Sequence, residues 1–187
     1  MKDRELIWKT LKEELLVSTR VFDVVQQTEV TENGLQGDYM AIKAPDWVVI
    51  VPVYQGNFVM VRQWRHGEDK LTTELPGGVV NEGEDPQVCA ERELLEETGF
   101  QAGKMTYLGR CSSNPALFKN HFNVYLAEEL TPTGEQHLDA DELLDYYLVP
   151  VEDAVRDFAS GEYTHAYTGT AMMLYFREKG CLPGGKH

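Results

Sequence analysis

Three glutamates at helical spacing form the cluster of this sequence that is best suited to chemistry. Glu93, Glu96 and Glu97 stand three and four residues apart, so on a helix they share one face within an arc of roughly 100°. An acidic cluster is often only a solvated helix face. Here, however, Gly77 and Gly78 precede it, and glycine lets a backbone carbonyl approach a ligand closely. The combination predicts a cation site.

The donor atoms indicate which cation the site would take. Carboxylate and carbonyl oxygens, without His or Cys, suit Mg²⁺ or Mn²⁺, which keep waters and take further ligands from substrate phosphates. Arg92 directly precedes Glu93, and its planar guanidinium could orient the carboxylates by hydrogen bonds. An ion pair on the helix surface is the alternative role for this arginine, and its place beside Glu93 disfavours it. The sequence therefore predicts a Mg²⁺ (or Mn²⁺) site for a phosphorylated substrate.

The glutamates need a helix, and the sequence marks both of its ends. Asp85 can cap the free amide groups of the first turn, and Pro86 has no N–H donor to leave unpaired there. Gly99 can end the helix because it takes the left-handed conformation without steric cost. The predicted helix between them has about three and a half turns.

The remaining elements are predicted from turns and apolar runs. Residues 20–30 and 37–43 form a predicted hairpin, because Glu32-Asn33-Gly34 is a strong turn signal, whereas residues 3–18 are predicted to be a short helix or an irregular lead-in. The apolar residues 47–54 predict a strand that is buried on both faces. Further strands are predicted at residues 58–65, 71–75, 104–111, 121–128 and 143–149, helices at 151–160 and 168–179, and a polar loop at 131–141. This order predicts a mixed sheet with helices on its faces, in the α/β or α+β class.

Composition limits the function classes. The chain has 187 residues, 42% of them hydrophobic, and a net charge of −14. Without a run of lysines or arginines it is poorly suited to bind nucleic acid. Its first residues are too charged for a signal peptide, and no apolar run approaches the ~20 residues of a membrane span. The three scattered cysteines suit a reducing compartment, so we expect a cytoplasmic protein without a membrane or nucleic-acid partner.

The stretch from Gly78 to Phe100 resembles the Nudix box. Nine fixed positions at the family's spacing make this match far more specific than a lone glycine motif. They are Gly78, Glu84, Arg92, Glu93, Leu94, Glu96, Glu97, Gly99 and Phe100. Outside the box, Gln63-Trp64-Arg65, Glu74-Leu75-Pro76 and Pro115 make residues 8–178 similar to the ADP-ribose pyrophosphatase branch of the family.

The resemblance implies both a fold and an activity. It implies a Nudix α/β/α sandwich with a mixed sheet at residues 46–187, preceded by a small N-terminal β-hairpin layer at residues 1–45 that forms a homodimer. The implied reaction is metal-dependent hydrolysis of the pyrophosphate of ADP-ribose to AMP and ribose 5-phosphate.

The resemblance also implies metal ligands. The Gly77 carbonyl, Glu93 and Glu97 are the expected ligands, and Glu96 is expected to contribute to a further ion. Glu96 and Arg92 are counted with the catalytic residues.

Substrate-binding residues follow from the same resemblance. Arg65 is expected to contact the phosphate or the nucleobase, and Glu74 is expected near the base. Phe22 and Tyr39 of the hairpin are candidates for stacking on adenine, although packing between strands is at least as good an interpretation of both.

A late acidic residue is expected to orient or deprotonate the attacking water. Glu142 is the predicted base, and Glu135, Asp139 and Asp141 are the alternatives.

Departures from the family pattern leave the substrate open beyond its phosphates. Gly77 stands where Ala is usual, His66 follows Arg65 where Pro is common, and Ala116 replaces the usual Gly after Pro115. The first alternative is therefore a hydrolase of another nucleoside diphosphate sugar, a dinucleotide or a coenzyme A compound. The second is a sensor that binds ADP-ribose without cleaving it, which the complete set of box glutamates disfavours.

Overall fold

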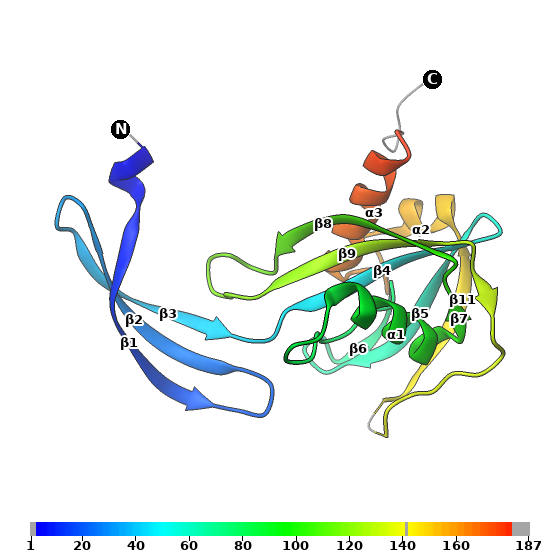
Figure 1. Ribbon diagram of the computed structural model, residues 1–187, viewed down its shortest axis with the longest axis horizontal. Helices are drawn as coiled ribbons and strands as arrows, with labels where there is room; N and C mark the ends of the chain where they lie inside the picture. Colours follow the sequence, from blue (N-terminus) through cyan, green and yellow to red (C-terminus); the bar gives the residue numbers. More distant parts are fainter. Residues whose placement is uncertain (1–2, 141, 181–187) are drawn as a thin grey trace. The chain divides into compact units, whose positions relative to one another are not determined.

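Residues 3–140 and 142–180 are described by the structure, a computed structural model (Figure 1). Contacts within the chain divide it into two units. The first comprises Met1–Pro45 and Ser112–His121, and the second comprises Asp46–Cys111 and Phe122–His187.

An antiparallel sheet in the order β1-β2-β3 forms the first unit. The hairpin of β2 (Asp23–Thr31) and β3 (Gln36–Lys43) confirms the one predicted from the turn. The prediction for residues 3–18 was wrong for most of its length, because β1 (Trp8–Ser18) follows the short 3-10 helix η1 (Asp3–Leu6) and pairs with β2. Two register shifts interrupt β1, so its apolar residues lack the strict alternation by which a strand is recognised.

A mixed six-stranded sheet forms the centre of the second unit. Its order is β11-β5-β4-β9-β8, with β6 also paired to β5. β4 runs parallel to β9, whereas β5 runs antiparallel to β4, β6 and β11. The strands are β4 (Trp47–Tyr54), β5 (Asn57–Arg65), β6 (Lys70–Glu74), β8 (Lys104–Ser112), β9 (His121–Glu128) and β11 (Leu144–Pro150), and a short separate pair joins β7 (Phe100–Gln101) to β10 (Thr131–Pro132). The predicted mixed sheet is confirmed.

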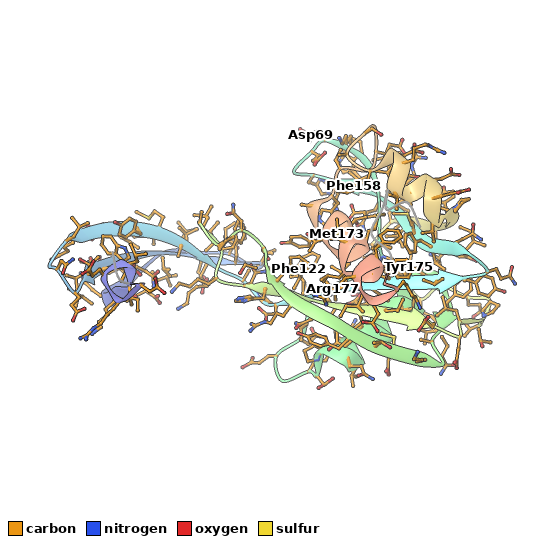
Figure 2. All side chains as sticks on the ribbon, turned by 90° about the horizontal axis from the view of Figure 1, so that it is seen from above. Asp69, Phe122, Phe158, Met173, Tyr175 and Arg177 are labelled. Carbon is orange, nitrogen blue, oxygen red and sulfur yellow. The ribbon has the colours of Figure 1, made fainter. Side chains whose placement is uncertain are left out.

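Helices cover both faces of this sheet, as the second unit of Figure 1 shows. They are α1 (Pro86–Thr98), α2 (Val151–Asp157) and α3 (Ala166–Glu178). Val48 and Ile50 of β4 pack against Leu94 of α1, and Val49 packs in the opposite core with Met172 of α3. In Figure 2, α3 can be found by the labelled side chains of Met173, Tyr175 and Arg177. Because neighbouring β4 residues enter different cores, the predicted burial on both faces and the α/β/α sandwich are confirmed.

The two C-terminal helices differ slightly from their predicted limits. α2 ends at Asp157 because Phe158 adopts extended backbone angles, and α3 begins at Ala166, two residues earlier than expected. Within the described ranges, every helix falls short of the length and apolar character that crossing a bilayer requires.

Candidate active site

Both predicted ends of α1 are present. The Asp85 carboxylate accepts hydrogen bonds from the N–H groups of Gln87 (2.8 Å) and Val88 (3.4 Å), and Pro86 occupies the first turn. Gly99 takes a left-handed conformation with φ of 67°, and its N–H donates to the Leu95 carbonyl at 2.9 Å. These caps fix the register of the helix, and hence which of its faces carries the glutamates.

A pocket of about 240 Å³ lies beside α1 in the second unit. It is lined by the start of β4, the end of β5, the glycine turn (Pro76-Gly77-Gly78), α1 and the late loop (residues 133–143). The lining residues are Trp47, Gln63, Arg65, Gly77, Gly78, Val79, Asn81, Arg92, Glu93, Glu97, Asp139 and Glu142. Most of the site residues that were predicted in this unit therefore lie together.

Glu93 and Glu97 are the buried acids of the pocket. Their residues are only 8% and 3% exposed, and burial raises the pKa of Glu93 to about 6 and that of Glu97 to about 8. The Gly77 N–H donates to Glu97 Oε2 at 2.9 Å, which opposes part of the rise in the pKa of Glu97. The charge of Glu93 also raises the pKa of Glu97, so the negative charge of the pair is incompletely compensated by the protein.

Replacing Glu97 with Gln should make the metal-free protein more stable at alkaline pH. The folded state raises the pKa of Glu97 from 4.5 to about 8, so the free energy of unfolding falls as the pH rises through this interval and levels off above it. Glutamine avoids this loss because it has no charge, and it keeps an acceptor for the Gly77 N–H. Thermal melts with chelator should give Glu97→Gln a larger Tm advantage near pH 9 than near pH 5. An equal Tm difference at the two pH values would argue against a strained carboxylate.

Arg92 holds several carboxylates of α1 in place. Its Nη1 donates to Glu93 Oε1 at 2.8 Å and to Glu96 Oε2 at 2.9 Å. Its Nε and Nη2 donate to the two oxygens of Glu84 at 3.0 and 3.1 Å. Glu84 also accepts the Asn81 N–H, and the arginine lowers its pKa to about 2. The fixed arginine and glutamates of the box thus form one network, in which Arg92 orients Glu93 and Glu96.

Gly78 lies directly against the Glu93 carboxylate. A Cβ atom at Gly78 would lie 2.3 Å from Glu93 Cδ and Oε1, which is far inside van der Waals contact. Only glycine leaves the Glu93 carboxylate where it is.

Gly78→Ala is therefore expected to lower kcat by about 10- to 100-fold, since displacing a catalytic group by about 1 Å costs that much. Steady-state kinetics at varied Mg²⁺ would measure the loss. Gly67→Ala is the matched control, because a Cβ at Gly67 meets no atom within 4 Å. Equal activity of the two variants would show that the close approach has no role.

Arg65 and Glu74 form an ion pair at the edge of the pocket. Arg65 Nε and Nη2 donate to Glu74 Oε1 and Oε2 at 2.8 and 2.7 Å. The Arg65 side chain is 29% exposed and lines the pocket, whereas the Glu74 side chain is 1% exposed and does not line it. Hydrogen bonding to Arg65 lowers the pKa of Glu74 against the opposing effect of burial. Glu74 therefore contacts Arg65 and not the open pocket.

The late loop brings two of the four candidate acids to the pocket. Asp139 and Glu142 line it, and the Asp139 N–H donates to Glu142 Oε2 at 3.2 Å. The charge of Glu142 contributes to the raised pKa values of Glu93 and Glu97. Glu135 is exposed and does not line the pocket. Asp141 lies outside the described residues.

Phe22 and Tyr39 lie in the first unit. Phe22 is 38% exposed and lines a shallow hollow with residues 19–23 and 43–45. Tyr39 is 44% exposed, and its ring meets that of Trp8 edge to face at 5.3 Å. Both rings are therefore available for contact, and Tyr39 already has a packing partner within its own sheet.

The donor set fits a divalent cation. The raised pKa values of the two buried carboxylates indicate that the protein places too little positive charge around them. A cation between them and the glycine turn would supply that charge. Among residues 3–140 and 142–180, no three His, Cys, Asp or Glu side chains form a group able to hold a metal ion alone. Mg²⁺ commonly uses one or two protein carboxylates together with waters and substrate phosphates.

Sequence reasoning missed several residues around this site. Trp47, Gln63 and Asn81 line the pocket, and His165 contacts Glu74. Trp47 was recognisable only as the start of a buried strand. Gln63 and Asn81 lie within the quoted motifs but were given no role of their own, and His165 belongs to none of them. Their proximity to the site depends on the register between strands and on the packing of α3 against the sheet, neither of which local sequence encodes.

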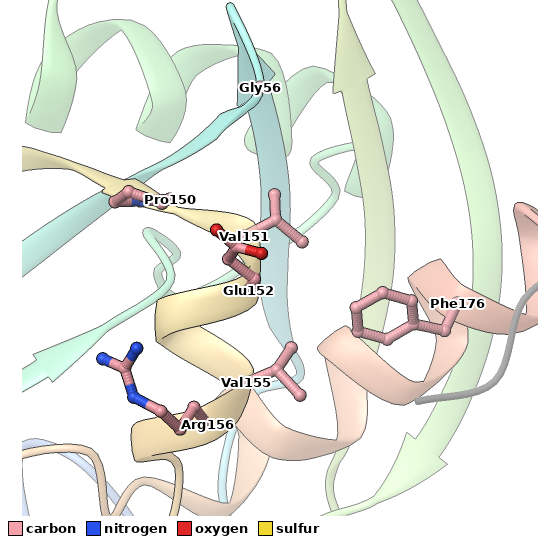
Figure 3. A pocket seen from close by; sticks show the side chains of 7 residues that line it. All are labelled: Gly56, Pro150, Val151, Glu152, Val155, Arg156 and Phe176. Carbon is pink, nitrogen blue, oxygen red and sulfur yellow. The ribbon is translucent and has the colours of Figure 1, made fainter. Parts of the chain in front are cut away.

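A second hollow of about 550 Å³ lies at the β4–β5 turn and α2 (Figure 3). Val151, Val155 and Phe176 give it a largely apolar lining. Its arginine, Arg156, is paired with Asp153 and Asp157. Without a set of acids comparable to that beside α1, this hollow is a poor candidate for the chemistry.

Comparison with known proteins gives a domain match and relatives over nearly the whole chain. Residues 44–168 match the NUDIX domain. The ADP-ribose pyrophosphatase of Bacillus subtilis (strain 168) is 33% identical over 180 residues, which cover 95% of this chain and 97% of that protein. The methanol dehydrogenase activator of Bacillus methanolicus is 31% identical over 150 residues, covering 79% and 81% of the two chains.

Solved structures contain the same fold. A crystal structure of an ADP compounds hydrolase matches with a TM-score of 0.81 over 94% of this chain and 97% of that one. The sequence identity is 24%, so this likeness supports the architecture alone.

Proposed function

This chain belongs to the Nudix family of pyrophosphohydrolases, and we propose that ADP-ribose is the substrate that it cleaves, to AMP and ribose 5-phosphate. The similarity to an ADP-ribose pyrophosphatase over 95% of the chain supports this substrate. One structural observation carries the proposal: Arg65, Glu93, Glu97 and Glu142 line one pocket. An anion-binding arginine beside several acids is the arrangement that a metal-dependent phosphoryl hydrolase needs.

We assign Mg²⁺ (or Mn²⁺) to Glu93, Glu97 and the Gly77 carbonyl, with Glu96 contributing to a further ion. When bound, such an ion neutralises charge on the pyrophosphate and lowers the pKa of a coordinated water. Arg92 orients Glu93 and Glu96 through its two hydrogen bonds. The buried, raised-pKa carboxylates support this assignment, because cation binding would relieve their repulsion.

Glu142 is the proposed general base. It would accept a proton from the attacking water as the water displaces one phosphate of the substrate. Its place in the pocket lining and its electrostatic effect on Glu93 and Glu97 support this role. Asp139 is the alternative, because it lines the same pocket.

Arg65 is the proposed phosphate anchor. A guanidinium has five N–H donors, and the ion pair with Glu74 occupies two of them. The other donors of the partly exposed side chain remain for substrate oxygens. Glu74 would act on the substrate through Arg65.

We propose a cytoplasmic homodimer in which the first unit contacts a second copy of the chain. Support comes from its exposed apolar side chains, such as Leu11 (62%), Leu15 (60%) and Leu35 (63%). In such a dimer Phe22 and Tyr39 could stack on the adenine base, a contact worth about 1–3 kcal/mol by analogy with single-stranded nucleic acids. Light scattering should give the mass of a dimer, and a monomeric mass at working concentration would contradict this assembly.

A substrate panel tests the proposed activity. The protein with Mg²⁺ should hydrolyse ADP-ribose with a higher kcat/KM than other nucleoside diphosphate sugars, dinucleotides or coenzyme A. Faster cleavage of another member would retain the chemistry and reassign the substrate. Tight binding of ADP-ribose without cleavage of any member would instead favour a sensor.

A further inference from the structure

We propose that His165 is a positioning residue for the proposed hydrolysis: it fixes the Glu74 carboxylate, and Glu74 in turn holds Arg65 in the orientation that binds substrate phosphate. The inference rests on the proposed function for its substrate. His165 lies in the segment before α3, far in sequence from the Nudix box and from Arg65.

Both carboxylate oxygens of Glu74 are fully engaged by neighbouring side chains. Oε1 accepts hydrogen bonds from Arg65 Nε at 2.8 Å and from the Thr72 hydroxyl. Oε2 accepts from Arg65 Nη2 at 2.7 Å and lies 3.0 Å from His165 Nδ1. Each oxygen therefore has two partners, and the carboxylate is 1% exposed. A buried carboxylate held at four points has one orientation, and the bidentate pair transmits that orientation to Arg65.

His165 is itself held in place for this contact. It occupies the N-cap position of α3, yet its side chain makes no capping hydrogen bond. The imidazole instead contacts Glu74, and its ring lies 4.9 Å from that of Tyr167, which stacks on Phe122 at 4.3 Å. Because a carboxylate only accepts, Nδ1 carries the hydrogen in this contact.

Neighbouring contacts join the same two segments. The Thr73 N–H donates to the Glu162 carbonyl at 2.9 Å, and the Leu75 N–H donates to the Thr168 hydroxyl at 3.1 Å. The contacts at Thr73, Glu74 and Leu75 thus fasten the end of β6 to residues 162–168. Pro76 and Gly77 follow directly, so the segment before α3 supports both the arginine and the glycine turn.

The test compares variants that keep or remove the donor at Nδ1. His165→Ala should raise the KM for ADP-ribose by about 10- to 100-fold, the effect of losing one hydrogen bond to a charged group, and leave kcat within about twofold. His165→Asn should restore the KM, because its amide nitrogen occupies nearly the position of Nδ1. Thr170→Ala is the matched control, since the Thr170 hydroxyl donates within α3, to the Ala166 carbonyl at 3.0 Å. Should His165→Ala fail to fold, His165→Phe keeps a ring beside Tyr167 and removes the donor.

A double-mutant cycle separates positioning from a merely structural role. In an Arg65→Ala background, His165→Ala should change KM no further. An equal rise in both backgrounds, an unchanged KM in His165→Ala, or no recovery in His165→Asn would each overturn the proposal.

An activity-independent readout distinguishes failure of this proposal from failure of the proposed substrate. The Arg65 Nε–H signal in a ¹⁵N spectrum should be protected from solvent exchange in the wild type and exchange faster in His165→Ala. Protection that is unaltered in His165→Ala overturns the positioning role. Faster exchange supports it even if the wild type does not cleave ADP-ribose.

Discussion

Replacing Glu93 with Gln is expected to lower kcat for ADP-ribose by at least about 10³-fold, since removing several kcal/mol of metal-ion stabilisation has this effect. Glutamine keeps the size of the side chain and can still accept from Arg92, so the fold should persist. The variant loses the negative charge of a buried carboxylate in the pocket. Steady-state kinetics with Mg²⁺ would measure kcat, and a thermal melt would verify folding.

Glu91→Gln provides the control for this substitution. Glu91 lies on the same helix, is exposed, and accepts a surface hydrogen bond from Gln87 at 3.0 Å. Its replacement should leave kcat near that of the wild type. A Glu93→Gln protein with near-wild-type turnover would refute the metal assignment for α1.

Glu142→Gln is expected to lower kcat by about 10²- to 10³-fold, the usual contribution of a positioned general base. KM should change little, because Arg65 and the other carboxylates remain.

The alternative bases provide the comparison. Asp139→Asn removes the other late-loop acid of the pocket, and Glu135→Gln removes one that lies outside its lining. Both should retain most of the wild-type kcat. A larger loss in Asp139→Asn than in Glu142→Gln would transfer the role of base to Asp139.

Local signals were sufficient to predict most elements of the fold. The caps at Asp85 and Gly99 predicted both ends of α1, because cap geometry depends on neighbouring residues alone. The apolar run of β4 predicted a strand buried on both faces, because this pattern is also contained in consecutive residues. β1 escaped prediction because its register shifts interrupt the pattern and its side chains are mostly exposed.

The candidate site was predictable where one motif carries it. Glu93 and Glu97 share a helix face, so their spacing placed them together, and the resemblance supplied Arg65 and Glu142. The burial of Glu74 beneath Arg65 could not be foreseen, because it depends on the register between β5 and β6. The role of His165 could not be predicted from the sequence for a similar reason, since its contact with Glu74 depends on how α3 packs on the sheet.

Product analysis tests directly whether the protein is a metal-dependent ADP-ribose hydrolase. ADP-ribose would be incubated with the protein in Mg²⁺ and, in parallel, in excess chelator, and the products would be separated by chromatography. A metal-dependent ADP-ribose hydrolase should give equal amounts of AMP and ribose 5-phosphate with Mg²⁺ and leave ADP-ribose intact with chelator. Intact substrate under both conditions, or equal cleavage under both, would contradict it.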